Sequence, residues 1–572
     1  MDQISSLRSM DVSVHSGDTQ QRLRSRAVLV GRANLRQFRS GWVELCRSVL
    51  SDALLPPLVQ RGLLGLILFA YLVVRLWTIR TPALDRTAWK EIDYIAISTN
   101  YWKHGFDFFR PEVTWPAEPP RVTEIELPVV PYTAALLYEV LGFNAYSVRL
   151  VTLLSFVLLQ VYVFRLTKRE LGPVIGLVAA FASSLMALYH PFGRFLLSEP
   201  LLIAMSTAFV FHFAQWVDYQ RESDWVLAML SLSLAISLKL TALYMLVPLF
   251  WIVFRRSGGR GRAYRGVILL VLSALILPLL WYSYAYHLEN IGVHQYGIFR
   301  GHNKMQTLTM LTDPNWYRTM FVRVAGQVLG GEVGLLLCTT GIVIALWLRK
   351  GELFFAYLAA IGAFFAIVAE GNLDAPYRQM TSIPSLSVFV ALGATAVAAA
   401  VVTGVTAVKK LRISRCPRAL VFLVACTLLM LAHPVRRRHI VFSDPLQPMH
   451  QDRWEFAQEI ARYVGGDAKL AVAGEYSVHV GGNDLSPVLF HYLGVQGWNV
   501  QPEDWSLAAM ERLIQKGATH FVALPTYGEQ ESGPFLRDEA GERFVKELKV
   551  RYRVLYETGN QLLLDLRQPV QH

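Results

Sequence analysis

The stretch SVRLVTLLSFVLLQVYVFRLTKRE, residues 147–170, decides the fold class, because a long apolar run in it ends in a basic loop. Apolar runs of roughly 15 to 25 residues recur along the chain, and that is the length a helix needs to cross a bilayer. Of the 572 residues, 53% are hydrophobic and only 17% are charged, unlike a soluble protein of this size. The sequence therefore predicts a mainly α polytopic membrane protein.

The apolar runs indicate eleven spans, each a single helix. They lie at residues 62–79, 147–165, 172–190, 199–217, 224–239, 241–255, 266–284, 332–348, 353–370, 381–405 and 419–433. A further apolar piece, PVVPYTAALLYEVLG at 128–142, is short, and two prolines interrupt its start. We expect it to be a juxtamembrane or partly re-entrant helix rather than another span.

Basic residues set the expected orientation, because short loops rich in lysine and arginine stay on the cytoplasmic side. With the basic N-terminal tail inside, alternation also puts RLTKRE (165–170), RRSGGRGRAYR (255–265) and KKLRISRCPR (409–418) inside. The stretch HPVRRRH (433–439) argues the other way, but large domains translocate largely regardless of charge. We expect a multi-pass protein of the inner (plasma) membrane, with a cytoplasmic N-terminus and an extracytoplasmic, or periplasmic, C-terminal domain.

Three parts of the chain follow from this topology. They are a basic cytoplasmic tail at 1–58, a transmembrane domain at 59–433 with long outer loops at 80–146 and 285–331, and an extracytoplasmic soluble domain at 434–572. In the last part, RWEFAQEIARYV and WSLAAMERLIQKG have helical periodicity, whereas KLAVAGE, HFVALP and RVLYETGNQLLLDL are typical of strands. The alternation predicts a small α/β domain.

Charge and cysteine content exclude several other classes of protein. The net charge of +12 comes from short loops that set topology, so we expect membrane lipids and no nucleic acid as partners. The four cysteines predict neither a disulfide framework nor a metal cluster, because they lie in the tail, in spans or in a basic loop. No cofactor is expected.

Ionisable and polar side chains gather near the span ends that should face outward. Such groups are costly at membrane depth, so we interpret them first as functional. They are Glu91, Asp93, Glu124 and Glu126 in the first outer loop, Arg194 and Glu199 in HPFGRFLLSEP, Lys239 in AISLKLTALY, and Asp374, Tyr377 and Arg378 in GNLDAPYRQ.

Each of these side chains also has a purely structural interpretation. Lys239 could extend from a span end to the interface, and Glu199 could favour the dipole at the start of a helix. Arg194 could be a solvated loop residue, and Tyr377 could belong to an interfacial aromatic belt. For Glu124 we prefer the interpretation of a solvated surface acid.

The stretch WKEIDYIAISTNYWKHG, residues 89–105, carries two acids that compete for one role. If this stretch is a helix, one face of it holds Lys90, Asp93, Asn100 and His104. Glu91 then lies on nearly the opposite side, so only one of the two carboxylates points into a site. That carboxylate could take a proton from an acceptor hydroxyl or amine, as a general base does.

Two stretches resemble a known family. WKEIDYIAISTNYWKHGFDFFRP and EIELPVVPYTAALLYEVLGFNAYSVRL are similar to the opening of bacterial membrane glycosyltransferases of the GT-C class. These are relatives of the protein O-mannosyltransferases and of the lipid A aminoarabinose transferase. SLKLTALYMLVPL is similar to their lysine-containing span end, and LFHYLGVQGWNV and LIQKGATHFVAL to the C-terminal domain of some members. The positions that match the opening pattern are Asp93, Glu126 with Pro128, Leu141 with Gly142, and Arg149. The resemblance runs from about residue 60 to the end and implies a GT-C fold.

The resemblance also implies a reaction. One sugar would pass from a polyprenyl-phosphate-linked donor to an acceptor on the outer side, with an aspartate of the first outer loop as the base. By position this role falls to Asp93. Many members have a direct Asp-Glu pair where this chain has Lys90-Glu91, so an alternative alignment gives the role to Glu91. Tyr94 stands where the closer members have threonine.

The leading hypothesis is thus an inverting glycosyltransferase that acts on an acceptor lipid, glycan or protein. Its scheme requires no metal, because cationic side chains can supply the charge that a leaving phosphate needs. The alternative is a flippase or transporter of a lipid-linked sugar, which would need no base. The expected site comprises Asp93 (rival Glu91) as base, Lys239, Arg194, Arg378 and Tyr377 at the donor phosphate, and Glu199, Glu126, Asn100 and His104 as further candidates.

Overall fold

The computed structural model describes most of the membrane part and much of the C-terminal part of the chain. The described residues are 55–79, 88–256, 261–293, 296–299, 305, 307–409, 417–432, 451–473, 487–524, 539–559 and 561–569. The predicted tail, apart from residues 55–58, and the stretch HPVRRRH lie outside the described residues.

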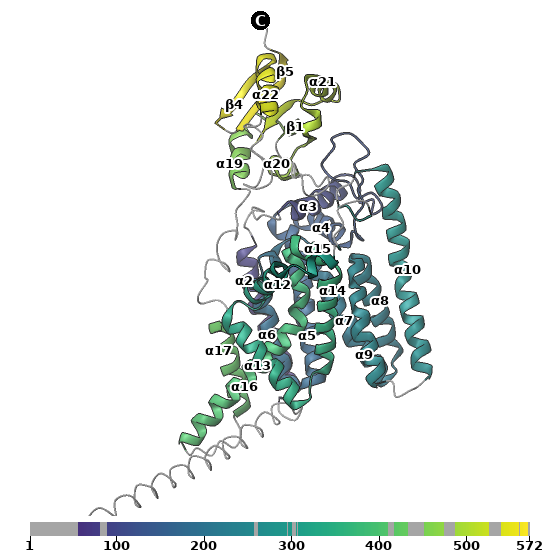
Figure 1. The fold of residues 1–572 in the computed structure, drawn as a ribbon, viewed down its shortest axis with the longest axis vertical. Helices are drawn as coiled ribbons and strands as arrows, with labels where there is room; N and C mark the ends of the chain where they lie inside the picture. Colours follow the sequence, from purple (N-terminus) through teal and green to yellow (C-terminus); the bar gives the residue numbers. More distant parts are fainter. Residues whose placement is uncertain are drawn as a thin grey trace, which may run out of the picture.

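Eleven of the described helices form a bundle, and each of them falls on one of the predicted spans. They are α2 (Pro57–Thr78), α5 (Ala145–Leu171), α6 (Pro173–Tyr189), α7 (Glu199–Tyr219), α8 (Glu222–Leu238), α9 (Leu246–Arg256), α10 (Gly261–Ile291), α13 (Glu332–Leu348), α14 (Glu352–Ile367), α16 (Ile383–Lys409) and α17 (Pro417–Ala432). Figure 1 shows them running along the long axis, with α10 at one edge and α17 at the other. The prediction of a mainly helical membrane fold is confirmed.

The length of these helices supports fewer complete spans than predicted. Five described segments are long and apolar enough to cross a membrane: Pro57–Thr78, Ala145–Leu171, Glu199–Tyr219, Tyr264–Ile291 and Pro376–Val402. A sixth is added if Pro314–Val328 and Glu332–Leu348, which meet at 99°, form one broken span. α8 and α9 fall short because the backbone leaves the helix at Lys239, and a 3₁₀ turn, η2 (Leu240–Met245), separates them.

α5 illustrates how local sequence fixes the helix ends. Its first turn is closed by a capping box, in which the Asn144 side chain accepts from the Ser147 amide and the Ser147 hydroxyl accepts from the Asn144 amide, both at 3.1 Å. At the other end Gly172 adopts a φ of +93°, which a residue with a Cβ rarely adopts. Pro173 then opens α6 at the position where a missing amide costs nothing.

Short elements gather at one end of the bundle, which we call the α3 end. They are α3 (Ala88–Lys103), α4 (Val129–Leu141), α11 (Thr307–Leu311), α12 (Pro314–Arg323), α15 (Ala369–Asp374), the 3₁₀ turns η1 (Pro191–Arg194) and η4 (Pro376–Ser382), and the π-helical turn η3 (Val324–Val328). α4 is the short helix predicted at 128–142. In Figure 1 the α3 end faces the C-terminal part of the chain.

The C-terminal part contains a mixed five-stranded sheet in the order β2-β1-β3-β5-β4. Its strands are β1 (Lys469–Ala473), β2 (Gln496–Val500), β3 (His520–Ala523), β4 (Tyr552–Thr558) and β5 (Gln561–Pro569). β1 pairs in parallel with β2 and β3, whereas β5 pairs antiparallel with β3 and β4. The three predicted strand stretches correspond to β1, β3 and the β4–β5 hairpin, while β2 was not predicted.

Helices cover both faces of this sheet. Alternate side chains of β1 therefore belong to two separate cores. Ala471 and Ala473 pack with Phe544 of α22 (Glu539–Arg551) and with residues of α21 (Leu507–Gln515). Leu470 and Val472 pack with residues of α19 (Gln451–Ile460) and α20 (Pro487–Leu493). The sheet is therefore the middle layer of an α/β arrangement.

The sheet docks on the loop between α3 and α4. Glu118 of that loop pairs with Lys516 at 2.6 Å and accepts a hydrogen bond from the Trp498 indole. Arg121 donates to Gln496 of β2 at 3.0 Å. Ala117 is buried among the apolar residues of the sheet, so this loop is part of its core.

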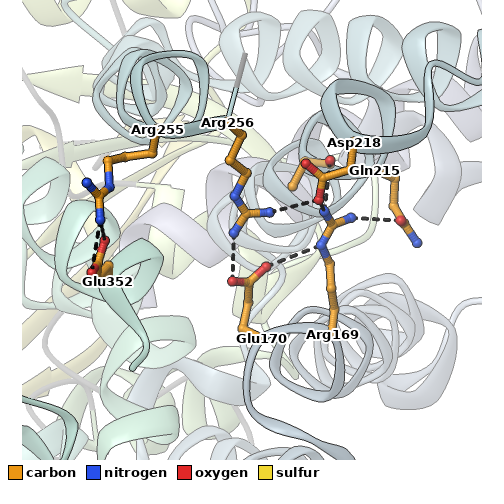
Figure 2. Close-up of polar contacts among 8 residues, drawn as sticks. Arg169, Glu170, Gln215, Asp218, Arg255, Arg256 and Glu352 are labelled. Carbon is orange, nitrogen blue, oxygen red and sulfur yellow. Dashed lines mark hydrogen bonds and ion pairs between the residues drawn. The ribbon is translucent and has the colours of Figure 1, made fainter. Parts of the chain in front are cut away.

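The opposite end of the bundle is held by ion pairs between helix ends, drawn in Figure 2. Arg169 at the end of α5 contacts Asp218 near the end of α7, donates to Gln215 at 2.7 Å, and pairs with its neighbour Glu170 at 3.2 Å. Arg256, at the end of α9, pairs with Glu170 at 2.7 Å. These partly buried contacts join three helices in one network.

We expect Arg169→Ala to destabilise the bundle, since it removes several charge-assisted hydrogen bonds at once. The expected loss is about 1–3 kcal/mol, seen as a lower unfolding temperature of the detergent-purified protein by tryptophan fluorescence. Arg255→Ala is the matched control, because its ion pair with Glu352 is exposed (side chains 51% and 44%) and such pairs contribute about 0–1 kcal/mol. Equal effects of the two substitutions would contradict this role for the network.

Candidate active site

The centre of the α3 end is a cluster of buried charges around Glu199. Glu199 is 1% exposed, forms an ion pair with Lys239, and lies 3.6 Å from Lys90. The Lys90 ammonium also donates to the Tyr377 hydroxyl at 3.0 Å. We call Lys90, Glu199, Lys239 and Tyr377 the lysine cluster. It joins α3, α7, the α8–η2 break and η4.

Local backbone structure explains why these charges are tolerated. Glu199 lies in the first turn of α7, where the helix dipole favours an anion, and Lys239 caps the carboxyl end of α8, where it favours a cation. The extended backbone of Lys239, with φ of −167°, ends α8. The carboxyl end of α8 thereby meets the amino end of α7, where Glu199 lies. Lys239 does not extend from the span end to the interface, because the residue is only 8% exposed and its ammonium is paired with Glu199.

Within the lysine cluster cations outnumber carboxylates, and the nearby Glu126 carboxylate offsets part of this charge. Two lysines share one carboxylate, and Arg378 follows Tyr377 in η4 with only 8% exposure. The buried Nε and Nη1 atoms of Arg378 have no hydrogen-bond acceptor among the residues that the structure describes. Burying such donors unsatisfied costs free energy, so the arrangement favours the binding of an anion.

Lys90 keeps its charge despite being buried. Burial lowers the pKa of Lys90, but attraction by Glu199, Tyr377 and Glu126 outweighs it and raises the pKa well above its usual value. The ammonium is therefore protonated at neutral pH. Lys90 shares the predicted face of α3 with Asp93, but it was not among the predicted site residues.

Asp93 lies one turn after Lys90 on α3 and is 1% exposed. It faces Tyr296, whose pKa is raised well above its usual value by burial first and by the Asp93 carboxylate second. Beside it, the Tyr94 hydroxyl donates to Ser198 at 3.1 Å and approaches Glu126 at 3.5 Å. Tyr94 and the partly buried Glu126 thus border the lysine cluster, and Asp93 lies one turn along α3 from Lys90. The sequence did not point to Tyr296, which comes from the distant second long loop.

Glu91 makes a different set of contacts from Asp93, as the helical period predicts. Both of its oxygens accept from Arg149 of α5, at 2.7 and 2.8 Å. The backbone amide of Leu196 donates to the same carboxylate at 3.0 Å, and Arg149 also donates to the Ile79 carbonyl at 2.7 Å. Glu91 is fully buried, so this bidentate pair ties α3 to α5 and to the segment before α7.

Glu124 corrects one expectation from the sequence, because it is buried rather than solvated. Its carboxylate accepts from the backbone amides of Tyr296 at 2.9 Å and Gly297 at 2.6 Å, and from the Thr123 hydroxyl at 3.0 Å. Glu124 therefore fixes residues 296–297 against the first loop. No local signal reveals this, since the two amides that donate to Glu124 lie far along the chain.

Asn100 and His104 contact groups outside the lysine cluster, and a third expected site residue, Arg194, differs from expectation in its burial. Asn100 donates to the backbone carbonyls of Glu112 and Val113 at 2.7 and 3.1 Å, which fixes the loop after α3. His104 is half exposed and lies 3.6 Å from Glu112. Arg194 is buried rather than solvated, with its guanidinium 5.9 Å from the centre of the Phe195 ring. Within the described residues, no three His, Cys, Asp or Glu side chains are grouped to hold a metal ion.

We expect Glu91→Gln to destabilise the protein strongly, because it leaves the Arg149 guanidinium buried without its carboxylate. Breaking such a pair costs about 3–5 kcal/mol, measurable as a lower unfolding temperature and a smaller monodisperse yield in detergent. Asp93→Asn, the same neutralisation two residues further along α3, is the control and should unfold near the wild-type temperature. A Glu91→Gln protein as stable as wild type would contradict the structural role.

Comparisons with known proteins agree with this architecture. Residues 120–282 match the family model described as dolichyl-phosphate-mannose-protein mannosyltransferase. A search of curated protein sequences found no match.

Solved structures extend the likeness over most of the chain. ArnT from Cupriavidus metallidurans bound to undecaprenyl phosphate has a TM-score of 0.57 at 15% identity, over 88% of this chain and 98% of that one. Its apo state gives 0.56 at 16% identity over the same shares. The apo Archaeoglobus fulgidus oligosaccharyltransferase gives 0.50 at 12% identity, over 81% of this chain and 69% of that one. This chain therefore has the GT-C fold of these membrane glycosyltransferases.

Proposed function

We propose that the protein transfers a sugar from a polyprenyl-phosphate-linked donor to an acceptor on the extracytoplasmic side, with inversion at the anomeric carbon. The observation that carries this proposal is the lysine cluster with Arg378, an anion-binding arrangement one helical turn from the buried carboxylate of Asp93. The likeness in fold to a protein solved with undecaprenyl phosphate supports a lipid phosphate as the anion.

In the proposed reaction Asp93 accepts the proton of the acceptor nucleophile, a hydroxyl or an amine, as the nucleophile attacks the anomeric carbon. The bond from that carbon to the phosphate oxygen breaks in the same displacement, and one displacement inverts the configuration. The leaving polyprenyl phosphate takes up the negative charge. Lys90, Lys239 and Arg378 stabilise that charge through preorganised donors in a site of low dielectric constant.

Two further groups have supporting roles in this scheme. Glu199 holds both ammonium groups in place and keeps the empty cluster from carrying two uncompensated charges. Tyr94 and Ser198 link α3 to the start of α7, so that the base and the cationic groups keep a fixed separation. Glu91 is the rival base by alignment, but its bidentate pair with Arg149 supports a structural role instead.

The first test is sugar transfer by the intact protein in nanodiscs. Synthetic polyprenyl phosphates carrying mannose, glucose, galactose, arabinose or aminoarabinose would be offered with lipid A, oligosaccharide and peptide acceptors. For whichever pair reacts, Asp93→Asn should lower the rate by about 10²–10⁴-fold, the usual contribution of a general base.

Each other outcome of this test points away from the proposal. Full activity of Asp93→Asn would remove Asp93 from the reaction. Loss in Glu91→Gln, in protein that unfolds at the wild-type temperature, would move the base to Glu91. Movement of the lipid-linked sugar across the bilayer with no transfer product would favour the flippase.

The second test concerns the anion. Arg378→Met should weaken binding of undecaprenyl phosphate about 10–100-fold, because one hydrogen bond to a charged group contributes about 1.5–3 kcal/mol. Binding would be measured by native mass spectrometry or by titration of intrinsic fluorescence. Arg551→Met, at an exposed ion pair of α22, is the control and should leave the Kd unchanged. An unchanged Kd in Arg378→Met would exclude Arg378 from the phosphate site.

A further inference from the structure

A polar cavity of about 330 Å³ lies beyond the carboxyl end of α3, outside the lysine cluster. Its volume is within the range of small-molecule sites in proteins, about 300–1,000 Å³. The proposed reaction does not use any of its lining side chains. Those on which the argument rests are Asn100, Tyr101, His104, Arg110, Glu112 and Arg121.

The cavity lies on the same stripe of α3 as the proposed base. Asn100 is seven residues after Asp93, which is two helical turns and about 10 Å along the axis. Lys90 is one turn before Asp93, in the opposite direction. Along α3 the order is therefore phosphate site, base, cavity. Asp93 does not itself line the cavity, so a molecule bound there would have to extend along α3 to reach it from the side opposite Lys90.

The charges of the cavity largely compensate one another. Glu112 pairs with Arg110 at 3.1 Å and with Arg121 at 3.0 Å, and lies 3.6 Å from His104. Asp107, which also lines the cavity, supplies a second carboxylate. The lining thus offers many hydrogen-bond donors and acceptors with little net charge. That chemistry suits a ligand rich in hydroxyl groups, each of which can both donate and accept, better than it suits an anion.

An aromatic ring completes this lining. The Tyr101 hydroxyl donates to the Phe108 carbonyl at 2.9 Å, and its ring packs edge-on against Tyr132 with centroids 5.2 Å apart. The ring is therefore fixed in orientation. Because Tyr101 is only 2% exposed, it stiffens this wall of the cavity.

The walls of the cavity are held in place before any ligand binds. Asn100 fixes the backbone of the loop at Glu112 and Val113, and the Val113 amide donates to the Arg121 carbonyl at 3.0 Å. Arg121 in turn donates to Gln496 of β2. A site that is already ordered loses little conformational entropy on binding.

We propose that this cavity is a subsite for the glycan part of the acceptor, which it orients so that the reacting group reaches Asp93. The proposal rests on the proposed function, because it deepens the acceptor side of that reaction. The glycan could belong to a glycolipid headgroup or to an oligosaccharide, and the probes below separate these sources. A glycan subsite implies that the acceptor is a carbohydrate rather than a peptide.

The test measures binding without catalysis, by saturation-transfer NMR on the full-length protein in nanodiscs. The probes are chitobiose, mannotriose, lipid A and a serine- and threonine-containing peptide. His104→Trp fills the cavity, and Arg110→Ala removes a side chain that is 59% exposed and paired at 3.1 Å with Glu112. Arg551→Ala is the matched control, since that side chain is 50% exposed and paired at 3.0 Å with Glu511, away from the cavity.

We expect at least one carbohydrate probe to bind wild type, Arg551→Ala and Asp93→Asn alike. Its signal should fall at least about fivefold in Arg110→Ala and vanish in His104→Trp, while both variants still bind undecaprenyl phosphate. A response to the free oligosaccharides identifies a glycan chain, and a response to lipid A alone identifies a glycolipid headgroup. Because Asp93→Asn keeps binding, failure of the proposed base and failure of this subsite give different results.

Three results would overturn the subsite. One is carbohydrate binding that His104→Trp and Arg110→Ala leave unchanged, and another is the absence of binding by every carbohydrate probe. The third is a cavity-dependent signal from the peptide alone, which would make the acceptor a protein.

Discussion

The position of α3 depends on the buried ion pair between Glu91 and Arg149. Four hydrogen bonds meet there: two between the carboxylate and the guanidinium, one from the Leu196 amide and one to the Ile79 carbonyl. Such a pair adds little net stability compared with apolar packing. It does restrict the geometry, because moving either partner away would leave the other as a buried charge without its counter-ion. Lys90, Asp93, Tyr94 and Asn100 all project from the helix that this pair fixes. The geometry of the site is thus set by an interaction outside it.

Charge balance explains why the site can be both buried and stable. Glu199 and Lys239 sit at helix ends whose dipoles favour them, and Glu199 lies between the two ammonium groups. One positive charge remains in the lysine cluster, and Arg378 adds another with donors that no described acceptor meets. The buried donors of Arg378 favour the binding of an anion. The proposed phosphate binding and the stability of the fold would therefore depend on the same charges.

Periodicity carried most of what could be predicted from the sequence. Every apolar run proved helical, and the 3.6-residue period correctly sent Glu91 and Asp93 to different neighbours. What failed depended on contacts between distant segments. Glu124 looks like a surface acid until residues 296–297 donate to it, and β2 is too polar to be recognised without β1 beside it. Asn100 lies on α3 as predicted, whereas His104 lies just past the end of the helix, and the loop that follows determines what both side chains contact. Local pattern fixes which face a residue occupies, whereas the partner on that face comes from the tertiary fold.

The C-terminal sheet contributes to the same constraint, because α20 covers the side of α3 that faces away from the lysine cluster. Ile92 is fully buried beside Val488. His491 of the same helix lies near Glu91 and Arg149, and burial lowers its pKa to about 4, so it adds no third charge to that pair at neutral pH. An apolar cover over an ion pair removes water and strengthens the attraction between its charges.

On its other side the sheet holds Glu118 and Arg121 of the loop that forms the polar cavity. One docked layer thus secures both the helix that carries the proposed base and the wall of the proposed acceptor subsite, although none of its described residues belongs to the lysine cluster.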